Sequence, residues 1–423
     1  MSAFFRFPPA RPARVALLLS LAVAAAGAQT PAPPAVVALA PAAAGPSLRE
    51  ALDAAWALSP AARSADNRRA DVQAREHAAA SWINGSPSVL LAQRSDRFSN
   101  NGGFREYEAE LELPIWSPGV RSSSQRELAA QRLAFEPGQL VARLKIAAAV
   151  RETAASLALA RTEGELARRK HSEALVLAQD VERRVQAGDS ARVDGLQAQS
   201  LVQQAASERD QAELALTRLQ HQWLALTGLA AVPALEEVVP AGNTSVQPGH
   251  PALLAAQTRV QAAQARLAFS EADRRDPMAV GVGVTRERAG FGAAGETSLR
   301  LALKIPLGTD RRNAPRIAAA RAELDEAQAD LDTAQRQTQG DVASAMAELE
   351  VARRTEASMA ERARLSTEVQ ALLAKAWRLG ESDLPTRLRA DGEKFEADLS
   401  LARARGGLQR AISRLNQSLG LLP

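Results

Sequence analysis

The 423-residue sequence contains no cysteine and few aromatic side chains, which make up 4% of the chain and include a single tyrosine. Without cysteine, the chain can form neither disulfides nor thiolate metal sites. Aromatic side chains supply much of the buried area of an ordinary globular core, so their scarcity argues against such a core. The abundance of alanine and of mixed charge instead favours helices packed closely side by side.

The sequence also lacks a long apolar stretch and, beyond its first residues, a charge excess. Three arginines precede an apolar run at 15–26 that ends in a small-x-small site. This pattern predicts a secretory signal over residues 1–28, cleaved between Ala28 and Gln29. No later run reaches 18 apolar residues, so no transmembrane helix is expected. Without the three leader arginines, 49 basic residues face 48 acidic ones, and the charge gives no reason to expect a nucleic-acid partner.

No spacing typical of a catalytic, cofactor or metal site is present. Gly290 to Gly295 fits G-x-G-x-x-G, but a dinucleotide site requires this loop between a strand and a helix, and here it joins two expected strands. The histidines have no partner at metal-ligand spacing and are His77, His171, His221 and His250. We therefore expect no enzyme activity, no cofactor and no metal. Acidic residues interleaved with arginine along helices predict solvated or interhelical salt-bridging faces.

Two copies of one unit make up most of the chain. The copies share a Leu-x-(Leu/Ile)-Pro segment, a first glycine and a second glycine, each pair 192 positions apart: Leu111 and Leu303, Gly188 and Gly380, Gly228 and Gly420. We expect a Pro/Ala-rich lead-in at 29–46, a first repeat at 47–229, a linker at 230–249 and a second repeat at 250–423.

Each repeat contains a stretch in which apolar and polar side chains alternate. With an upstream partner, each stretch predicts a β-hairpin, at about 87–115 and 278–307. The alternation suits a membrane barrel with lipid on one side and water on the other, although amphipathic hairpins of soluble domains share it. Such a barrel must close and has at least about eight strands, so four strands per chain require an oligomer. Six aromatic residues near the strand ends suit an aromatic girdle: Trp82, Phe98, Phe104, Tyr107, Trp116 and Phe291.

The other segments have helical periodicity. Val120 to Ala187 is a run of 68 residues, about 100 Å long as a helix, and Asn313 to Leu379 is its counterpart. Shorter helices are expected to stack end to end beside the long ones, at 47–81 and 190–227 in the first repeat and at 250–273 and 382–419 in the second. Pro137-Gly138 interrupts the pattern of the first long helix, which should kink or bulge there.

The tandem duplication, the Leu-x-(Leu/Ile)-Pro strand ends and the helix hairpins around Gly188 and Gly380 resemble the TolC family of outer membrane factors. The resemblance covers about Ser47 to Leu422. It implies a mainly α fold in which long antiparallel helices form an α-barrel. It also implies that the two β-hairpins contribute four strands to a trimeric 12-stranded membrane β-barrel. The chain would lie in the outer membrane of a Gram-negative cell and extend into the periplasm, with the linker around the middle of the tunnel.

The resemblance implies a passive duct of a tripartite efflux system. It would export small molecules or metal cations delivered by an inner-membrane pump, of the resistance-nodulation-division type, and a periplasmic adaptor. Its other partners would be two further copies of the chain and outer membrane lipid. One alternative is the outer membrane duct of a type I protein secretion system. Another, from a different class, is a periplasmic coiled-coil structural protein.

Turns at the periplasmic tips of this family carry a glycine followed six residues later by aspartate. The first turn matches with Gly188 and Asp194, whereas the second has Thr386, followed by Arg387. By this resemblance we expect the tips to gate the tunnel and contact the adaptor through seven residues: Gly188, Asp189, Asp194, Gly380, Glu381, Asp383 and Arg387.

Overall fold

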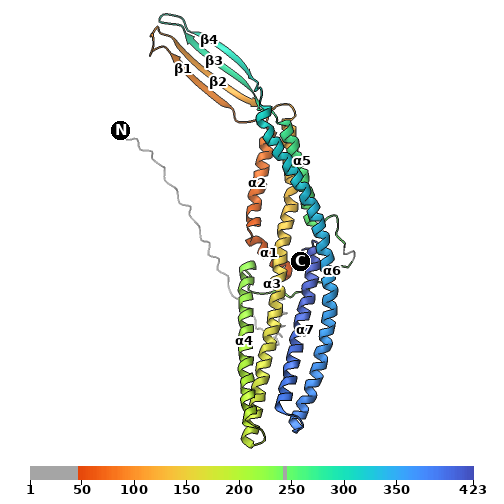
Figure 1. The fold of residues 1–423 in the computed structure, drawn as a ribbon. Helices are drawn as coiled ribbons and strands as arrows, with labels where there is room; N and C mark the ends of the chain where they lie inside the picture. The colour runs from red at the N-terminus through yellow and green to blue at the C-terminus, as the bar shows by residue number, and fades with distance from the viewer. Residues whose placement is uncertain (1–45, 242–244) are drawn as a thin grey trace, which may run out of the picture. The chain divides into compact units, whose positions relative to one another are not determined.

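The structure, a computed structural model, describes residues 46–241 and 245–423. The expected leader, its cleavage site at Ala28 and nearly all of the Pro/Ala-rich segment lie outside the described residues. Gly45–Pro423 cluster into one compact unit. The described residues of that unit form seven helices, which pack side by side or follow one another end to end, and a four-stranded sheet beyond one end of them (Figure 1). Across the described ranges, no helix has the length and apolar character needed to cross a bilayer.

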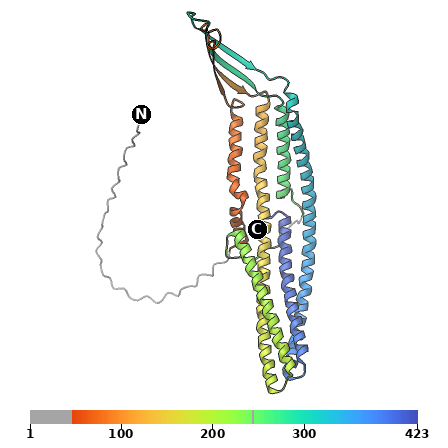
Figure 2. The same cartoon turned by 60° about the vertical axis from the view of Figure 1, so that its left-hand side comes forward.

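Both repeats fold in the same order: a short helix, a hairpin, a long helix and a second short helix. The first comprises α2 (Pro60–Ala80), β1 (Ser88–Ser95), β2 (Arg105–Ile115), α3 (Val120–Ala187) and α4 (Arg192–Thr227). The second comprises α5 (Pro251–Ala272), β3 (Met278–Arg288), β4 (Glu296–Lys304), α6 (Asp310–Leu379) and α7 (Leu384–Ser418). Helices α2 and α4 follow one another along α3, and α5 and α7 do so along α6, as Figures 1 and 2 show. The expected end-to-end stacking is confirmed.

The first short helix differs from the expectation of one continuous helix over 47–81. The chain instead forms α1 (Leu48–Leu58) and α2, separated at Ser59. Pro60 has no backbone N–H, and it favours an extended conformation in the residue before it. Ser59 takes that conformation, and its hydroxyl accepts a hydrogen bond of 3.1 Å from the Ala62 N–H. With α1 set apart, α2 has 21 residues against 22 in α5, so the two repeats match closely.

Pro137 does not interrupt the first long helix. Helix α3 is continuous through Pro137 and Gly138, and the proline ring is buried. A proline inside a helix leaves the carbonyl four residues earlier without its usual donor. Here that carbonyl belongs to Leu133, a residue that is 61% exposed. The helix therefore continues through the position where the sequence predicts a kink or bulge.

Small side chains allow the helices to pack closely. Alanine supplies much of the buried surface of α3, including Ala147, Ala154, Ala155, Ala160, Ala167 and Ala174. Ion pairs tie neighbouring helices together around these contacts. Lys170 of α3 meets Glu208 of α4 at 2.5 Å, and Arg414 of α7 meets Glu348 of α6 at 3.0 Å. The mixed charge pattern thus forms the interhelical bridges that the sequence predicted.

A buried ion pair joins the linker between the repeats to both halves. The guanidinium of Arg151, in α3, donates from Nε and Nη2 to Glu237 of the linker at 2.6–3.1 Å. Its Nη1 donates to the Gln417 side chain at 2.6 Å and to the Leu421 carbonyl at 3.0 Å. Arg151 is 3% exposed, so this pair is screened from solvent. It links the first repeat, the linker and the C-terminal end.

The four strands form one antiparallel sheet in the order β1-β2-β3-β4. Strand β2 pairs with β3, so the hairpins of the two repeats join. Two ion pairs then connect positions that are equivalent in the two repeats: Glu108 with Arg300, and Glu112 with Lys304. The duplicated hairpins therefore carry complementary charges on their second strands.

The register gives the sheet one apolar and one polar face. Tyr107, Ala109, Leu111 and Leu113 of β2 lie on the apolar face, and the glutamates between them lie on the other. Side chains on the apolar face are widely exposed, with Leu301 74% and Leu91 75% accessible. Within residues 46–241 and 245–423, strands β1 and β4 each have one edge without a strand partner. The sheet thus exposes one apolar face and the backbone groups of two strand edges.

Candidate functional site at the helix tips

Both helix hairpins turn at a glycine in the left-handed conformation, with φ of 86° at Gly188 and 76° at Gly380. The residue after each glycine donates its N–H to a carbonyl five positions back: Asp189 to Arg184 at 2.8 Å, and Glu381 to Ala376 at 2.9 Å. This pattern satisfies the last carbonyls of a helix and favours glycine, because any Cβ is strained at positive φ. The sequence therefore located both turns correctly.

Two of the expected aspartates cap the helices that follow the turns. The Asp194 carboxylate accepts a hydrogen bond of 3.2 Å from the Ala191 N–H at the start of α4. Asp383 is the N-cap of α7 and accepts one of 3.0 Å from the Thr386 N–H. Hydrogen bonds from the side chain and backbone of Thr386 lower the pKa of Asp383. The carboxylates at both tips thus have a structural task in addition to any role in gating.

The seven expected tip residues differ in exposure. Asp189, Glu381 and Asp383 are exposed, whereas Asp194 and Arg387 are half-buried. Arg387 pairs with Asp391 one helical turn later at 2.8 Å, so its positive charge is balanced locally. The arginine that follows Thr386 in the second repeat is consequently not an isolated cation at the tip.

A small apolar cluster joins the two hairpins next to these turns. Its buried members are Val181 of α3, Ala198 of α4, Trp377 of α6 and Leu384 of α7. The Arg184 guanidinium lies over the Trp377 ring, 4.7 Å from its centroid, and the indole Nε1 is buried without a hydrogen-bond partner. The sequence reading did not single out these residues. The position equivalent to Trp377 in the first repeat is Val185, and this difference between the repeats could have pointed to the tryptophan.

A buried carboxylate lies at the opposite end of the helices, near the sheet. Glu127 of α3 is 7% exposed and lines a hollow of about 570 Å³ together with Trp116 and Phe269. Burial raises its pKa, and the Arg266 guanidinium at 3.2 Å partly offsets the shift. The ion pair between Glu127 and Arg266 connects α3 of the first repeat with α5 of the second, next to the sheet.

The motifs set aside at the sequence level lie where expected. Gly290–Gly295 belong to the turn between β3 and β4, and no helix follows it directly. His250 caps α5. Within the part of the chain that the structure describes, no three histidine or acidic side chains are grouped so as to hold a metal ion.

Comparison with protein families gives a match over residues 245–421 to a model described as outer membrane efflux protein. The matched residues make up most of the second repeat and less than half of the chain. Comparison of the sequence with curated proteins finds no match.

The fold of the chain is similar to that of solved outer membrane channels. It is similar to the outer membrane protein VceC from Vibrio cholerae, with a TM-score of 0.71 and 15% identity over 88% of this chain and 96% of VceC. It is also similar to the MtrE outer membrane channel of Neisseria gonorrhoeae, with a TM-score of 0.70 and 18% identity over 89% of this chain and 90% of MtrE. CusC gives a TM-score of 0.72 and 16% identity over 91% of this chain and 96% of CusC. The resemblance to TolC-like channels is thus confirmed for the fold.

Proposed function

We propose that three copies of this chain form a passive export duct in the outer membrane of a Gram-negative cell, with the helices in the periplasm. The observation that carries the proposal is the sheet, which has one exposed apolar face and two strand edges without partners. Backbone groups at such edges cannot stay unpaired in hydrocarbon. Pairing β4 of one copy with β1 of the next closes a barrel of 12 strands around the polar face.

The proposed duct receives its cargo from an inner-membrane pump through a periplasmic adaptor. Small molecules or metal cations are the proposed cargo, and a pump of the resistance-nodulation-division type is the proposed energy source. Two proteins of similar structure, OprN and MtrE of Neisseria gonorrhoeae, are outer membrane channels, which supports the proposed duct. The repeats at 47–229 and 250–423 and the linker at 230–249 would each contribute one part of the tunnel wall.

The tips at Gly188 and Gly380 are proposed as the gate and the adaptor contact. Exposed Asp189, Glu381 and Asp383 are available to the adaptor, while Asp194 and Arg387 shape the starts of α4 and α7. The contact between Arg184 and Trp377 ties the hairpins of the two repeats together, so opening would separate this pair. Cation–π contacts of this kind contribute about 0.5–2 kcal/mol.

The duct is tested by expressing the full chain, isolating the outer membrane fraction and reconstituting the protein in planar bilayers. A heat-modifiable trimer with stable single-channel conductance is expected. A monomer that remains soluble without detergent would instead support a periplasmic coiled-coil protein. Export assays in a deletion strain, across metals, dyes, antibiotics and secreted proteins, separate efflux from type I secretion.

The gate is tested with Trp377→Ala and Asp194→Arg in the same bilayers. Loss of the contact between hairpins should raise the open probability, and charge reversal at the tip should change ion selectivity or adaptor coupling. Leu372→Ala, an exposed α6 position nearer the middle of the helix, serves as the control. Conductance and export equal to wild type in both test variants would refute the assignment of the gate.

A further inference from the structure

The apolar face of the sheet ends in a basic row at the end that carries the turns. Reading across the register, Leu91, Ala109, Val284 and Leu299 form the last apolar row of this face. The next row is Gln93, Tyr107, Arg286 and Thr297, and the row after it pairs Arg105 with Arg288. The glutamates of β2 lie on the opposite face, so this face carries its cations without carboxylates between them.

These arginines have few partners. Within residues 46–241 and 245–423, Arg286 and Arg105 make no hydrogen bond or ion pair through their side chains. Arg288 has one long hydrogen bond, from Nη2 to the Gly103 carbonyl at 3.5 Å, and its Nε is buried without a partner. Like charges directly opposite one another on adjacent strands are destabilising, as Arg105 and Arg288 are here. An anion between them would remove that repulsion.

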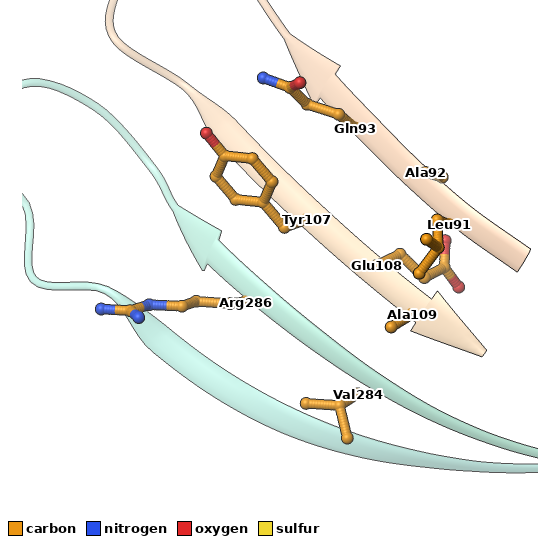
Figure 3. Close-up of a pocket in the computed structure, with 8 residues that line it drawn as sticks. All are labelled: Leu91, Ala92, Gln93, Tyr107, Glu108, Ala109, Val284 and Arg286. Carbon is orange, nitrogen blue, oxygen red and sulfur yellow. The ribbon is translucent and has the colours of Figure 1, made fainter. Parts of the chain in front are cut away.

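A hollow of about 430 Å³ lies on this face beside the basic row. Its apolar part is formed by Leu91, Ala109 and Val284. Glu108 also lines it, and its carboxylate is paired with Arg300. Figure 3 shows Tyr107 and Arg286 side by side at one end of this hollow, with Ala109 and Val284 at the other. A ligand that fits it has a hydrocarbon part and, next to it, an anionic part.

The position of the row along the strand identifies the side of the membrane. Met278, where β3 leaves the helices, and Arg286 are eight residues apart, or about 26 Å along a strand. Strands of membrane barrels tilt by roughly 35–45°, so 26 Å along a strand rises about 18–21 Å through an apolar band about 25 Å tall. Arg286 therefore lies in the half of the band farthest from the helices, which in the proposed duct is the outer leaflet.

We infer that this face binds a phosphorylated, acylated glycolipid of the outer leaflet, such as lipid A. Arg105, Arg286 and Arg288 hold the phosphate, for which the planar guanidinium is well suited, and the acyl chain occupies the hollow below Tyr107. The inference rests on the proposed function, because that function places this face in contact with lipid.

The test uses the full mature trimer in detergent, with lipid A and dephosphorylated lipid A as probes and native mass spectrometry as the readout. Wild type should retain lipid A and lose most of that retention with the dephosphorylated form. The double variant Arg286→Gln/Arg288→Gln should retain at least about tenfold less lipid A, since each cation at a membrane surface contributes a factor of about five. The matched control, Arg300→Gln/Lys304→Gln, removes two cations from the other face and should retain lipid A as wild type does.

Equal retention by wild type and by the arginine double variant would overturn the inference, as would equal retention of the two lipid probes by wild type. A loss in the control as large as in the double variant would overturn it too. Heat-modifiability of every trimer checks folding. A conducting wild-type trimer that retains no lipid A defeats only this inference, whereas a wild-type chain that inserts into no bilayer defeats the proposed duct together with it.

Discussion

Arg151 shows how one side chain joins parts of the chain that are far apart in sequence. All three of its nitrogens are hydrogen-bonded, to Glu237, Gln417 and the Leu421 carbonyl. Asn416 adds a hydrogen bond of 3.2 Å to the Val238 carbonyl, so the linker is held from two sides. A buried charge is tolerated only when it is paired and hydrogen-bonded, and this cluster meets both conditions.

Arg151→Met is expected to destabilise the protein by about 3–5 kcal/mol, because it leaves the Glu237 carboxylate buried without its cation. The measurement is chemical unfolding of the trimer in detergent, followed by circular dichroism. Arg168→Met is the control, since Arg168 pairs with Glu213 at 3.0 Å in an exposed position, and it should cost less than about 1 kcal/mol. Equal losses in the two variants would contradict a special role for the buried pair.

His250 is expected to make the stability of the protein depend on pH. It is the N-cap of α5, its Nδ1 accepts from the Ala252 N–H at 3.3 Å, and its Nε2 donates to the Ser418 carbonyl at 3.1 Å. Burial lowers its pKa below the ordinary value of 6.5. The folded state therefore binds fewer protons than the unfolded state, and stability is lost as pH falls below about 6.5.

His250→Asn keeps a neutral capping side chain and should remove part of this loss. Unfolding of wild type and variant is compared at pH 7.5 and pH 5, with His221→Asn in α4 as the control. The wild type and the control should lose more stability at low pH than His250→Asn. The same pH dependence in all three proteins would show that His250 is not responsible.

At both tip turns, the backbone conformation of a glycine ends the long helix. Helices α3 and α6 each end at a glycine in the left-handed region, and the following short helix begins within a few residues. A Cβ at Gly188 meets no atom within 4 Å, so the cost of a substitution there is conformational and not steric. Positive φ costs a residue with a Cβ about 1–2 kcal/mol.

Gly188→Ala is therefore expected to destabilise the first tip by about 1–2 kcal/mol, whereas Gly340→Ala, in the middle of α6, should be neutral or stabilising by up to about 1 kcal/mol. Gly340 also has open space at its Cβ position, which makes it a matched control. Hydrogen exchange of the tip amides, measured by mass spectrometry, is the readout. Slower exchange at the tip in Gly188→Ala would contradict this account.

At the scale of the whole molecule, the two faces of the sheet decide where the protein resides. The apolar face exposes large side chains, including Leu299, Leu301 and Leu303 of β4. The polar face carries the glutamates of β2 together with Arg300 and Lys304. In the proposed trimer the first face meets lipid and the second meets water.

Leu301→Arg should reduce folded trimer in the outer membrane fraction severely, because a cation on the lipid face costs about 2–4 kcal/mol near the middle of the bilayer. Ser298→Arg places the same side chain on the polar face of the same strand and should allow trimers to form. The measurement is the amount of heat-modifiable trimer in membrane fractions. Equal yields for both variants would contradict the assignment of the faces.

The sequence by itself determined the elements, since periodicity and turn residues act locally. The expected end of α3 at Ala187 and the hairpins of both repeats agree with the structure. At Pro137 the local signal did not end the helix, since α3 continues through it. The helix expected over 47–81 is divided before Pro60, because Ser59 takes an extended backbone conformation.

Only the tertiary structure decided which distant residues meet. Three contacts join segments far apart in the chain. They are the ion pair of Glu108 with Arg300, the buried ion pair of Arg151 with Glu237, and the contact of Arg184 with Trp377. No local pattern encodes these partners, because they depend on how α3, α6 and the sheet are placed side by side. The charge pattern predicted that ion pairs would form between helices. Which residues form each pair depends on how the helices pack.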